Sequence, residues 1–267
     1  MTQLTWMVAD GIAVAQRNLI KIKRVPEVLV WVLLSPIMFV LLFAYVFGGS
    51  IDIPGLSYRE FLIAGIFAQT VVFGATYTGA GLAEDMQKGI IDRFRSLPMT
   101  RSAVLVGRTA SDIVYNVLSI TIMALTGLAV GWRIHTSVWE AAAGFGLLLL
   151  FAYGFSWVMA TVGLLVPSPE VVNNASFMVI MPLTFISNVF VPSDNLPTPL
   201  RIFAEWNPLS AVTQSARNLF GNTSPLAPTP EAWSMQNPEL YALIWTFVLI
   251  AVFAPISVKL YQRAATK

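Results

Sequence analysis

The sequence contains no cysteine and only one histidine, His135. Without cysteine the chain can form no disulfide, no thiolate nucleophile and no cysteine-ligated metal centre. A single histidine also excludes a His-Glu-x-x-His zinc site, which needs two. We therefore expect no catalytic residue, no metal site and no cofactor held by this chain.

Charge is scarce as well, since 11% of the residues are Asp, Glu, Lys or Arg, against about 25% in an ordinary soluble domain. The net charge of +2 gives no electrostatic footprint for nucleic acid. No lysine follows a glycine, which excludes the Gly-Lys pair of a phosphate-binding P-loop. The chain is therefore not predicted to bind ATP in that way.

Hydrophobic residues are abundant instead, at 56% of the chain, and they gather in long uninterrupted runs. A helix needs about 20 apolar residues to cross a bilayer. Within the bilayer a continuous apolar segment can make all its backbone hydrogen bonds only as a helix, because the strands of a membrane β-barrel alternate apolar and polar side chains. The sequence predicts an all-α polytopic membrane protein with one transmembrane domain, residues 1–267. Its six predicted spans are Val28–Phe47, Phe61–Ala83, Ala103–Val130, Val138–Val166, Val171–Phe190 and Leu240–Leu260.

Basic residues divide unevenly between the two sides of these spans. Twelve of the 16 lysines and arginines lie before the first span, between the second and third spans or in the first turns of the third, or in the last turn of the sixth span and beyond it. The positive-inside rule therefore places both termini in the cytoplasm. The other four are assigned to the outer side: Arg59, Arg133, Arg201 and Arg217. The first apolar run starts near Val28 and is too long for the apolar core of a signal peptide, so we expect no cleavable signal.

Two segments outside the spans have an amphipathic pattern. In residues 1–26 the apolar side chains recur at helical spacing before Pro26, which predicts a helix lying along the inner membrane surface; a frayed polar tail is the alternative. In residues 191–239 the prolines divide the first part into two short helices, about Thr198–Trp206 and Leu209–Phe220. Both are too short to cross, so we expect an outer pair that is re-entrant or interfacial, with Trp206 as an anchor.

The connector between the second and third spans carries the third amphipathic pattern. Ile90, Phe94 and Leu97 recur at helical spacing among charged residues, and Pro98 follows, which disfavours further helix. A coupling helix near residues 84–98 would be too short to be stable alone. Its mixed charges suit a groove on another protein better than a lipid surface. A solvated loop whose charges only fix the topology is the alternative.

No charged side chain lies in the central part of any predicted span, which argues against an ion channel or a proton-coupled carrier. A route for a bulky amphipathic solute would use apolar contacts and a few hydrogen bonds. The candidate residues for this substrate pathway are Phe39, Phe43, Gln69, Tyr77, Asn174, Phe177 and Asn188. The alternative is that such polar groups only join helices. Asp112 follows Arg108 by four residues, so we expect a local ion pair between them, and Pro36 and Pro182 are expected to kink their spans.

The run "GIIDRFRSLPMTRSAVLVGR" resembles the coupling region of ATP-binding-cassette type-2 exporter permeases, especially the daunorubicin/doxorubicin-resistance type. The outer run "SNVFVPSDNLPTPLRIFAEWNPLSAVTQSAR" resembles the family's proline-rich turn, Asn-Pro pair and closing arginine. The resemblance matches Glu84, Gly89, Leu97, Pro98 and Arg101 to the family's coupling positions. Together with the amphipathic pattern, it leads us to expect coupling to an ATPase through Glu84, Asp85, Gly89, Ile90, Asp92, Arg93, Phe94, Arg95, Leu97, Pro98 and Arg101. It assigns an outer gate to Asn207, Pro208 and Arg217.

The resemblance implies a permease subunit in a bacterial plasma membrane. Its partners would be two cytosolic ATPase subunits, which bind ATP and magnesium, and a second permease, identical or not. The implied activity is ATP-driven export of a drug, an antibiotic or a lipid-like molecule. A polysaccharide or lipid-linked glycan is the alternative cargo. A membrane scaffold that only recruits a cytosolic partner, and a membrane enzyme acting on lipids or peptides, are the alternatives outside transport.

Overall fold

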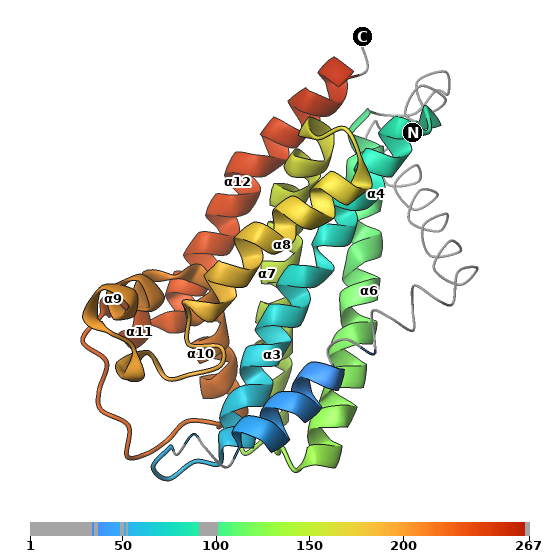
Figure 1. The fold of residues 1–267 in the computed structure, drawn as a ribbon. Helices are drawn as coiled ribbons and strands as arrows, with labels where there is room; N and C mark the ends of the chain where they lie inside the picture. The colour runs from blue at the N-terminus through green and yellow to red at the C-terminus, as the bar shows by residue number, and fades with distance from the viewer. Residues whose placement is uncertain (1–33, 35–36, 49–50, 52, 91–100, 265–267) are drawn as a thin grey trace.

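The structure is a computed structural model, and it describes residues 34, 37–48, 51, 53–90 and 101–264. The described residues form a bundle of helices without a β-sheet (Figure 1). The predicted interface helix at 1–26, the start of the first span and residues 91–100 lie outside the described part. The elements are η1 (Phe43–Phe47), α3 (Tyr58–Gly74), α4 (Thr76–Gln87), α6 (Arg101–Val130), α7 (Val138–Leu165), α8 (Pro169–Phe185), η2 (Ser193–Asn195), α9 (Thr198–Trp206), α10 (Pro208–Phe220), α11 (Trp233–Gln236) and α12 (Pro238–Ala264).

Four stretches of helix are long and apolar enough to cross a membrane, which confirms the predicted all-α polytopic fold. They are Tyr58–Gln87, Leu105–Val130, Val138–Leu165 and Pro238–Arg263. The predicted first span is represented by the short apolar helix Ile37–Val46, and the predicted fifth by the 17 residues of α8. The count of six therefore stays a prediction.

The helix α8 ends earlier than the sequence predicted. Its last residue is Phe185, and residues 186–190 form a turn instead of continuing to Phe190. Pro182 lies inside its last turn, where it removes a backbone donor and weakens the helix. Asn188, Val189 and Phe190 are buried in that turn, so the chain re-enters the bundle where a longer helix would have left it.

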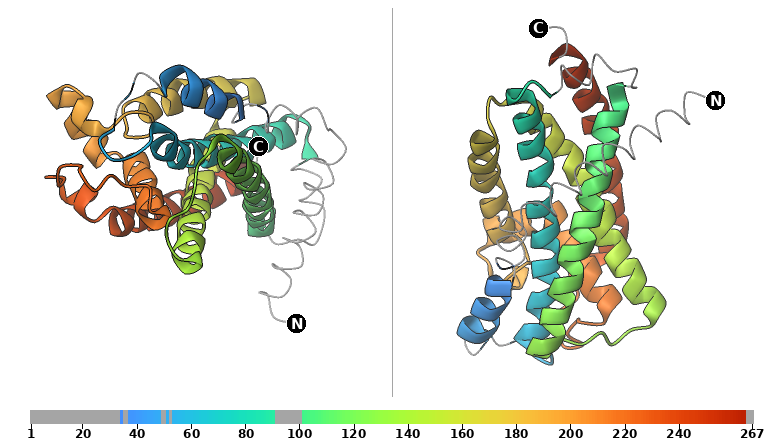
Figure 2. Two further views of the ribbon diagram at one scale, coloured as in Figure 1. Left: turned by 90° about the horizontal axis from the view of Figure 1, so that it is seen from below. Right: turned by 90° about the vertical axis from the view of Figure 1, so that its right-hand side faces the viewer.

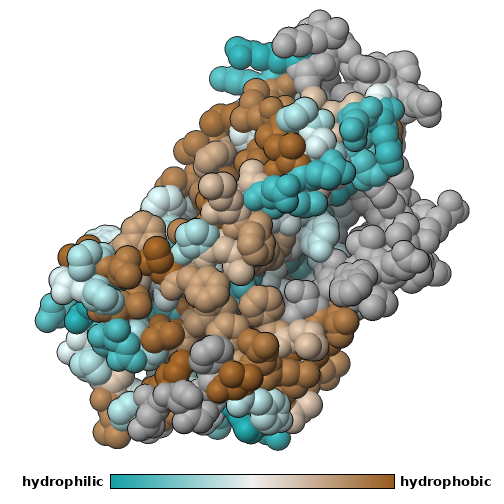
Figure 3. Space-filling model, in the orientation of Figure 1, coloured by the Kyte–Doolittle hydropathy of each residue, from teal (hydrophilic) through white to brown (hydrophobic). Residues whose placement is uncertain are grey.

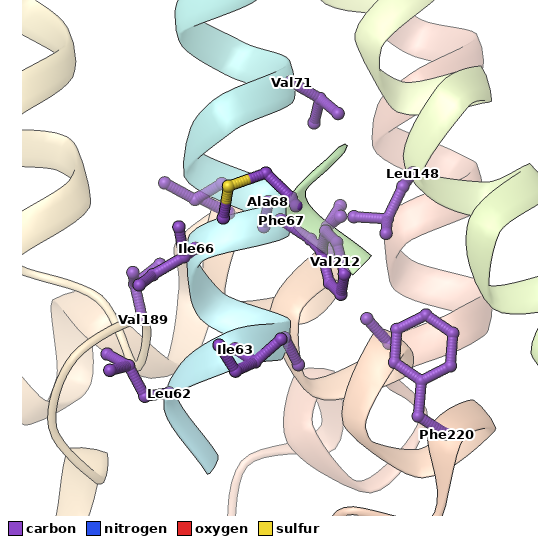
Figure 4. Packing of buried hydrophobic residues seen from close by; sticks show 14 of the residues in the cluster. Leu62, Ile63, Ile66, Phe67, Ala68, Val71, Leu148, Val189, Val212 and Phe220 are labelled. Atoms are coloured by element: carbon purple, nitrogen blue, oxygen red, sulfur yellow. The ribbon is translucent and has the colours of Figure 1, made fainter. Parts of the chain in front are cut away.

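The α3–α4 stretch is the centre of the bundle. In its most apolar window 83% of the residues are buried, against 22% for α12, so α12 is peripheral and presents apolar side chains outward. Ser57 caps α3 by accepting a hydrogen bond from the Glu60 amide. Leu62, Ile63 and Phe67 of α3 pack against side chains from α7, α10 and the turn after α8 (Figure 4).

The two short outer helices occur where the sequence predicted them, as α9 and α10. The helix α10 is mostly buried and packs against α3, α7 and α12, whereas α9 is more exposed. The pair is therefore folded into the bundle and is not a flat surface layer. Gly221, in the left-handed conformation with φ of 74°, ends α10.

The ends of the helices separate into two groups. The last residues of α4 and α12 and the first residues of α6 lie at one end of the bundle, whereas α9–α11 lie toward the other (Figures 1 and 2). Hydrophilic residues gather at the α4 end, and brown hydrophobic surface covers much of the face toward the viewer between the two ends (Figure 3). The end of α12 therefore lies at the same end of the bundle as the helix ends that flank the connector between α4 and α6 (Figures 1 and 2).

Candidate functional site

The predicted coupling segment begins inside a span. Glu84 and Asp85 belong to the last turn of α4, so they are not part of a separate helix, and Asp85 is buried. Lys88 donates a hydrogen bond to Glu84 and pairs with it over 2.5 Å, and this contact raises the pKa of Lys88. Gly89 then adopts the left-handed conformation, with φ of 63°, and its amide donates to the Met86 carbonyl. The chain therefore leaves the span at Gly89, as a glycine allows.

Of the other coupling residues, Ile90 directly follows this turn and Arg101 begins α6. Asp92, Arg93, Phe94, Arg95, Leu97 and Pro98 lie outside the described residues. Their assignment to an ATPase contact stays a prediction. The described part shows that the segment is anchored by one helix on each side, α4 before it and α6 after it.

Those two helices are tied together near the segment. The Arg108 guanidinium donates to the Tyr77 carbonyl over 2.7 Å, and the Thr78 hydroxyl donates to the Asp112 carboxylate. Asp112 is buried at 7% exposure. The expected ion pair between Arg108 and Asp112 does not form as a direct contact among the described residues, but the two groups interact electrostatically through space. Each charged group contacts α4 from α6, so two hydrogen bonds join these helices.

The helices α4 and α7 cross at backbone contact. A Cβ added at Gly163 would lie 2.2 Å from the Gly79 carbonyl oxygen, and one added at Gly79 would lie 2.5 Å from the Met159 carbonyl oxygen. Only glycine fits at such a crossing, which resembles the small-residue contacts of membrane helices. The sequence reasoning missed this crossing because the two glycines are only two of 17 and nothing local distinguishes them.

The predicted substrate-pathway residues lie in different places. Asn174 and Phe177 are exposed on α8. Tyr77 is 36% exposed, and its ring lies against the ring of Tyr115. Phe43 stacks on Phe39 and on Phe190, with ring centroids 5.9 and 4.4 Å apart. Gln69 and Asn188 are buried, and the side-chain oxygen of each has no hydrogen-bond partner within the described part of the chain. One enclosed route through all seven is therefore not formed in this arrangement, although the exposed face could be completed by a second chain.

The predicted outer-gate residues hold the α9–α10 pair in place. Asn207 caps α10 by accepting from the Leu209 amide over 2.9 Å, and its own amide donates to the carbonyls of Leu183 and Ile186. Pro208 follows at the first position of α10, which its fixed φ favours. The Asn-Pro pair thus starts α10 and fastens it to the end of α8.

Arg217 fastens the other end of α10. Its guanidinium donates to the carbonyls of Phe61, Asn188 and Val189 and lies 3.4 Å from the centroid of the Phe61 ring. The side chain is 1% exposed. The sequence assigned Arg217 to the outer side but did not predict its burial; the structure shows it as a clamp between α10, α3 and the turn after α8.

A cavity of about 340 Å³ adjoins this clamp. It lies between α10, α11, the segment after α8 and the loop after α10, and Arg217, Asn188, Gln214 and Met235 are among its lining residues. Asp194 and Pro228 stand at exposed positions of its wall. The cavity therefore connects a buried cation with the surface at the end of the bundle away from α4.

Comparison of the sequence with known proteins identifies related membrane proteins. The family profile described as ABC-2 type transporter matches residues 11–220. The daunorubicin resistance ABC transporter permease protein DrrB1 of Streptomyces coeruleorubidus is 31% identical over 247 residues, which cover 92% of this chain and 84% of that protein.

Two more distant relatives also match most of the chain. The "Probable doxorubicin resistance ABC transporter permease protein DrrC" of Mycobacterium tuberculosis is 21% identical over 73% of this chain and 67% of its own length. The polysialic acid transport protein KpsM of Escherichia coli is 22% identical over 84% of this chain and 83% of its own length. With the family profile covering most of the sequence, this multi-pass membrane chain belongs to the ABC-2 type transporter family.

Proposed function

We propose that this chain is the permease subunit of an ATP-driven exporter of hydrophobic or amphipathic small molecules. Two cytosolic ATPase subunits, which bind ATP and magnesium, would supply the energy through the segment between α4 and α6. A second copy of the permease would complete the pathway. The similarity to DrrB1, a daunorubicin resistance permease, over 92% of the chain supports a drug-like cargo.

The observation that carries the mechanism is the continuity of α3 and α4. Together they form the 30-residue stretch Tyr58–Gln87, the most buried of the four spans. At one end Glu84 and Lys88 lead into the coupling segment, and at the other the Phe61 carbonyl holds Arg217 of α10. A push at the coupling end would therefore reach the outer helix pair through one packed element.

Transport would need two arrangements of similar free energy that nucleotide binding biases. The Gly79–Gly163 crossing provides a fixed contact about which α4 could tilt against α7. The tilt would pull on Phe61 and hence on the clamp made by Arg217. The α9–α10 pair would then act as the outer gate, with Asn207 and Pro208 as its attachment to α8.

The second permease would pack on the apolar face made by α8 and residues 37–48. Phe177, Met178 and Val179 of α8 are exposed by 56, 78 and 66%, and Tyr45 and Val46 by 62% each. Hydrophobic surface is visible in this region (Figure 3). Asn173 and Asn174 on the same helix are also exposed, so a cleft between the two copies would carry amide groups within apolar walls.

Two other functions are supported by fewer observations. The similarity to KpsM, named as a polysialic acid transport protein, favours a glycan cargo, although its identity is 22%. A scaffold that recruits the ATPase without moving a solute would use the same coupling segment. The cargo panel in the experiment below separates all three.

The test is co-reconstitution of the permease with its ATPase in sealed vesicles. The panel contains an amphipathic aromatic amine, a short-chain fluorescent lipid and an acidic oligosaccharide, and a hydrolysis-deficient ATPase is the control. We expect ATP-dependent movement of one of the first two, lost with the deficient ATPase. Movement of the oligosaccharide alone would favour the glycan function. No movement of any solute, together with a stable complex, would favour the scaffold and refute export.

A further inference from the structure

The head of Arg108 occupies the place where position 81 would carry a side chain. A Cβ added at Gly81 would lie 1.8 Å from Nη2 of Arg108, and Cζ and Nη1 of the same guanidinium are its next nearest neighbours. Nη2 also donates to the Tyr77 carbonyl over 2.7 Å. The guanidinium of α6 is therefore seated on the bare backbone of α4, and only glycine at position 81 leaves room for it.

This contact is one of three that polar side chains of α6 make with the central span. Arg108, Asp112 and Asn116 follow one another at intervals of four residues, which places them on one face of the helix. The Asp112 carboxylate accepts from the Thr78 hydroxyl, and a Cβ added at Gly74 would lie 2.5 Å from Oδ1 of Asn116. The Arg108 contact is the nearest of the three to the coupling segment, because Arg108 comes first in α6.

No carboxylate holds Arg108 in this position by direct contact among the described residues. Its interaction with Asp112 acts through space, and its Nε group is buried without a hydrogen-bond partner in the described part of the chain. The side chain nevertheless belongs to the apolar stretch Leu105–Val130, where an ionisable group is costly and usually has a function. Its place is thus determined by the recess at Gly81 and by the Tyr77 carbonyl, and both belong to α4.

We propose that Arg108 is a positioning residue for coupling, an inference that rests on the proposed function. With its head seated at Gly81, α4 and α6 keep one register, so the two helices that flank the coupling segment move as a single unit when an ATPase displaces it. Without this seat the same displacement would separate the two helices or slide one along the other, and ATP would be hydrolysed while less cargo moved. Arg108 acts through the backbone of α4, by a contact between two packed elements.

The first experiment measures the amount of cargo moved per ATP hydrolysed, in sealed vesicles that contain the permease and its ATPase. The cargo is the member of the panel above that the unmodified chain moves. Arg108→Ala removes the head, and Gly81→Ala displaces it, because the nearest neighbours of the new Cβ are atoms at the far end of a flexible side chain. We expect each variant to lower this ratio at least about fivefold, and the double variant to lower it no further, because both changes remove one contact.

Two controls separate positioning from stability. Gly146→Ala adds a Cβ that meets no atom within 4 Å, and Thr109→Val removes a hydroxyl that donates to carbonyls of its own helix; both should keep the ratio of the unmodified chain. A purely structural role of Arg108 would reduce the amount of folded complex, so transport and ATP hydrolysis would fall together and their ratio would not change. That result, in Gly81→Ala as in Arg108→Ala, would overturn the proposal.

The second experiment does not depend on transport. Because the chain has no cysteine, Lys88→Cys and Val114→Cys introduce two spin labels, one directly after α4 and one on α6. The Lys88 side chain is 59% exposed and Val114 is 50% exposed. The distance between the labels is measured in the complex with the ATPase, with and without a non-hydrolysable ATP analogue.

We expect one distance in both states of the labelled chain, and a distance that nucleotide shifts or broadens once Arg108→Ala is added. A nucleotide-dependent distance without that change, or an unaltered distance with it, would also overturn the proposal. A chain that moves no cargo but keeps the expected distances would refute export and still support the positioning role of Arg108.

Discussion

Replacing Gly163 by alanine should force α4 away from α7. The added Cβ would lie 2.2 Å from the Gly79 carbonyl oxygen, which is 1.2 Å short of the 3.4 Å at which ordinary van der Waals contact begins. The obstacle is backbone on both sides, so no side chain can rotate to make room. Overpacking of this kind costs about 1–3 kcal/mol, and we expect the free energy of unfolding to fall by that amount.

Gly146 provides the matched control. It lies in the same helix, α7, and a Cβ added there meets no atom within 4 Å. Gly146→Ala should therefore be neutral, or stabilising by up to about 1 kcal/mol through helix propensity. The assay is denaturant unfolding of both variants in one detergent, with ATP-driven transport measured in parallel. If Gly163→Ala and Gly146→Ala differed by less than about 0.5 kcal/mol, the backbone crossing and the tilt about it would be refuted.

Three further predictions concern the coupling segment, the tie between α4 and α6, and the outer helix pair. Phe94→Ala should leave membrane insertion intact and abolish transport while the ATPase still hydrolyses ATP; normal transport would refute the coupling role. Thr78→Val removes the donor to the buried Asp112 carboxylate and should lower the free energy of unfolding by about 1–3 kcal/mol, an effect that Asp112→Asn should reduce in the double variant. Asn207→Ala removes the cap of α10 and two donors to the end of α8 and should cost about 1–2 kcal/mol, whereas Asn195→Ala, at an exposed position, should cost almost nothing.

Local patterns in the sequence were enough to predict much of the fold. Long apolar runs without alternating polarity predict membrane helices, because within a bilayer only helices and closed β-barrels satisfy their backbone hydrogen bonds, and barrel strands alternate. Prolines mark where α9 and α10 begin, and both helices occur as predicted. The Asn207–Pro208 pair also indicates the start of α10, because asparagine is a favourable N-cap residue and proline a favourable first residue of a helix.

Contacts between distant parts of the chain could not be predicted from local sequence patterns. The sequence assigned Arg217 to the outer side and gave no sign of its burial, because its carbonyl partners come from segments 29 and 156 residues away. Asp112 was expected to pair directly with the neighbouring Arg108, whereas its hydrogen-bond partner is Thr78, 34 residues away. In each case the contacts depend on tertiary packing, which local spacing does not reveal.

The shortening of α8 has a similar cause. Its apolar run continues to Phe190, and hydropathy alone cannot show where a helix stops. The turn at residues 186–190 forms because Asn207 satisfies the Leu183 and Ile186 carbonyls and Arg217 satisfies those of Asn188 and Val189. The end of one helix thus depends on residues of the next two.

The central claim is that the segment after α4 faces the cytoplasm and contacts an ATPase, and site-directed labelling tests it most directly. Because the chain has no cysteine, Lys88→Cys and Leu226→Cys each introduce a unique thiol, at positions where the Lys88 side chain is 59% exposed and Leu226 is 70% exposed. A membrane-impermeant maleimide applied to intact cells should label the second variant and not the first, and a short bifunctional crosslinker should join the first variant to the ATPase subunit. Labelling of Lys88→Cys from outside, or the absence of any crosslink from it to the ATPase, would contradict the account.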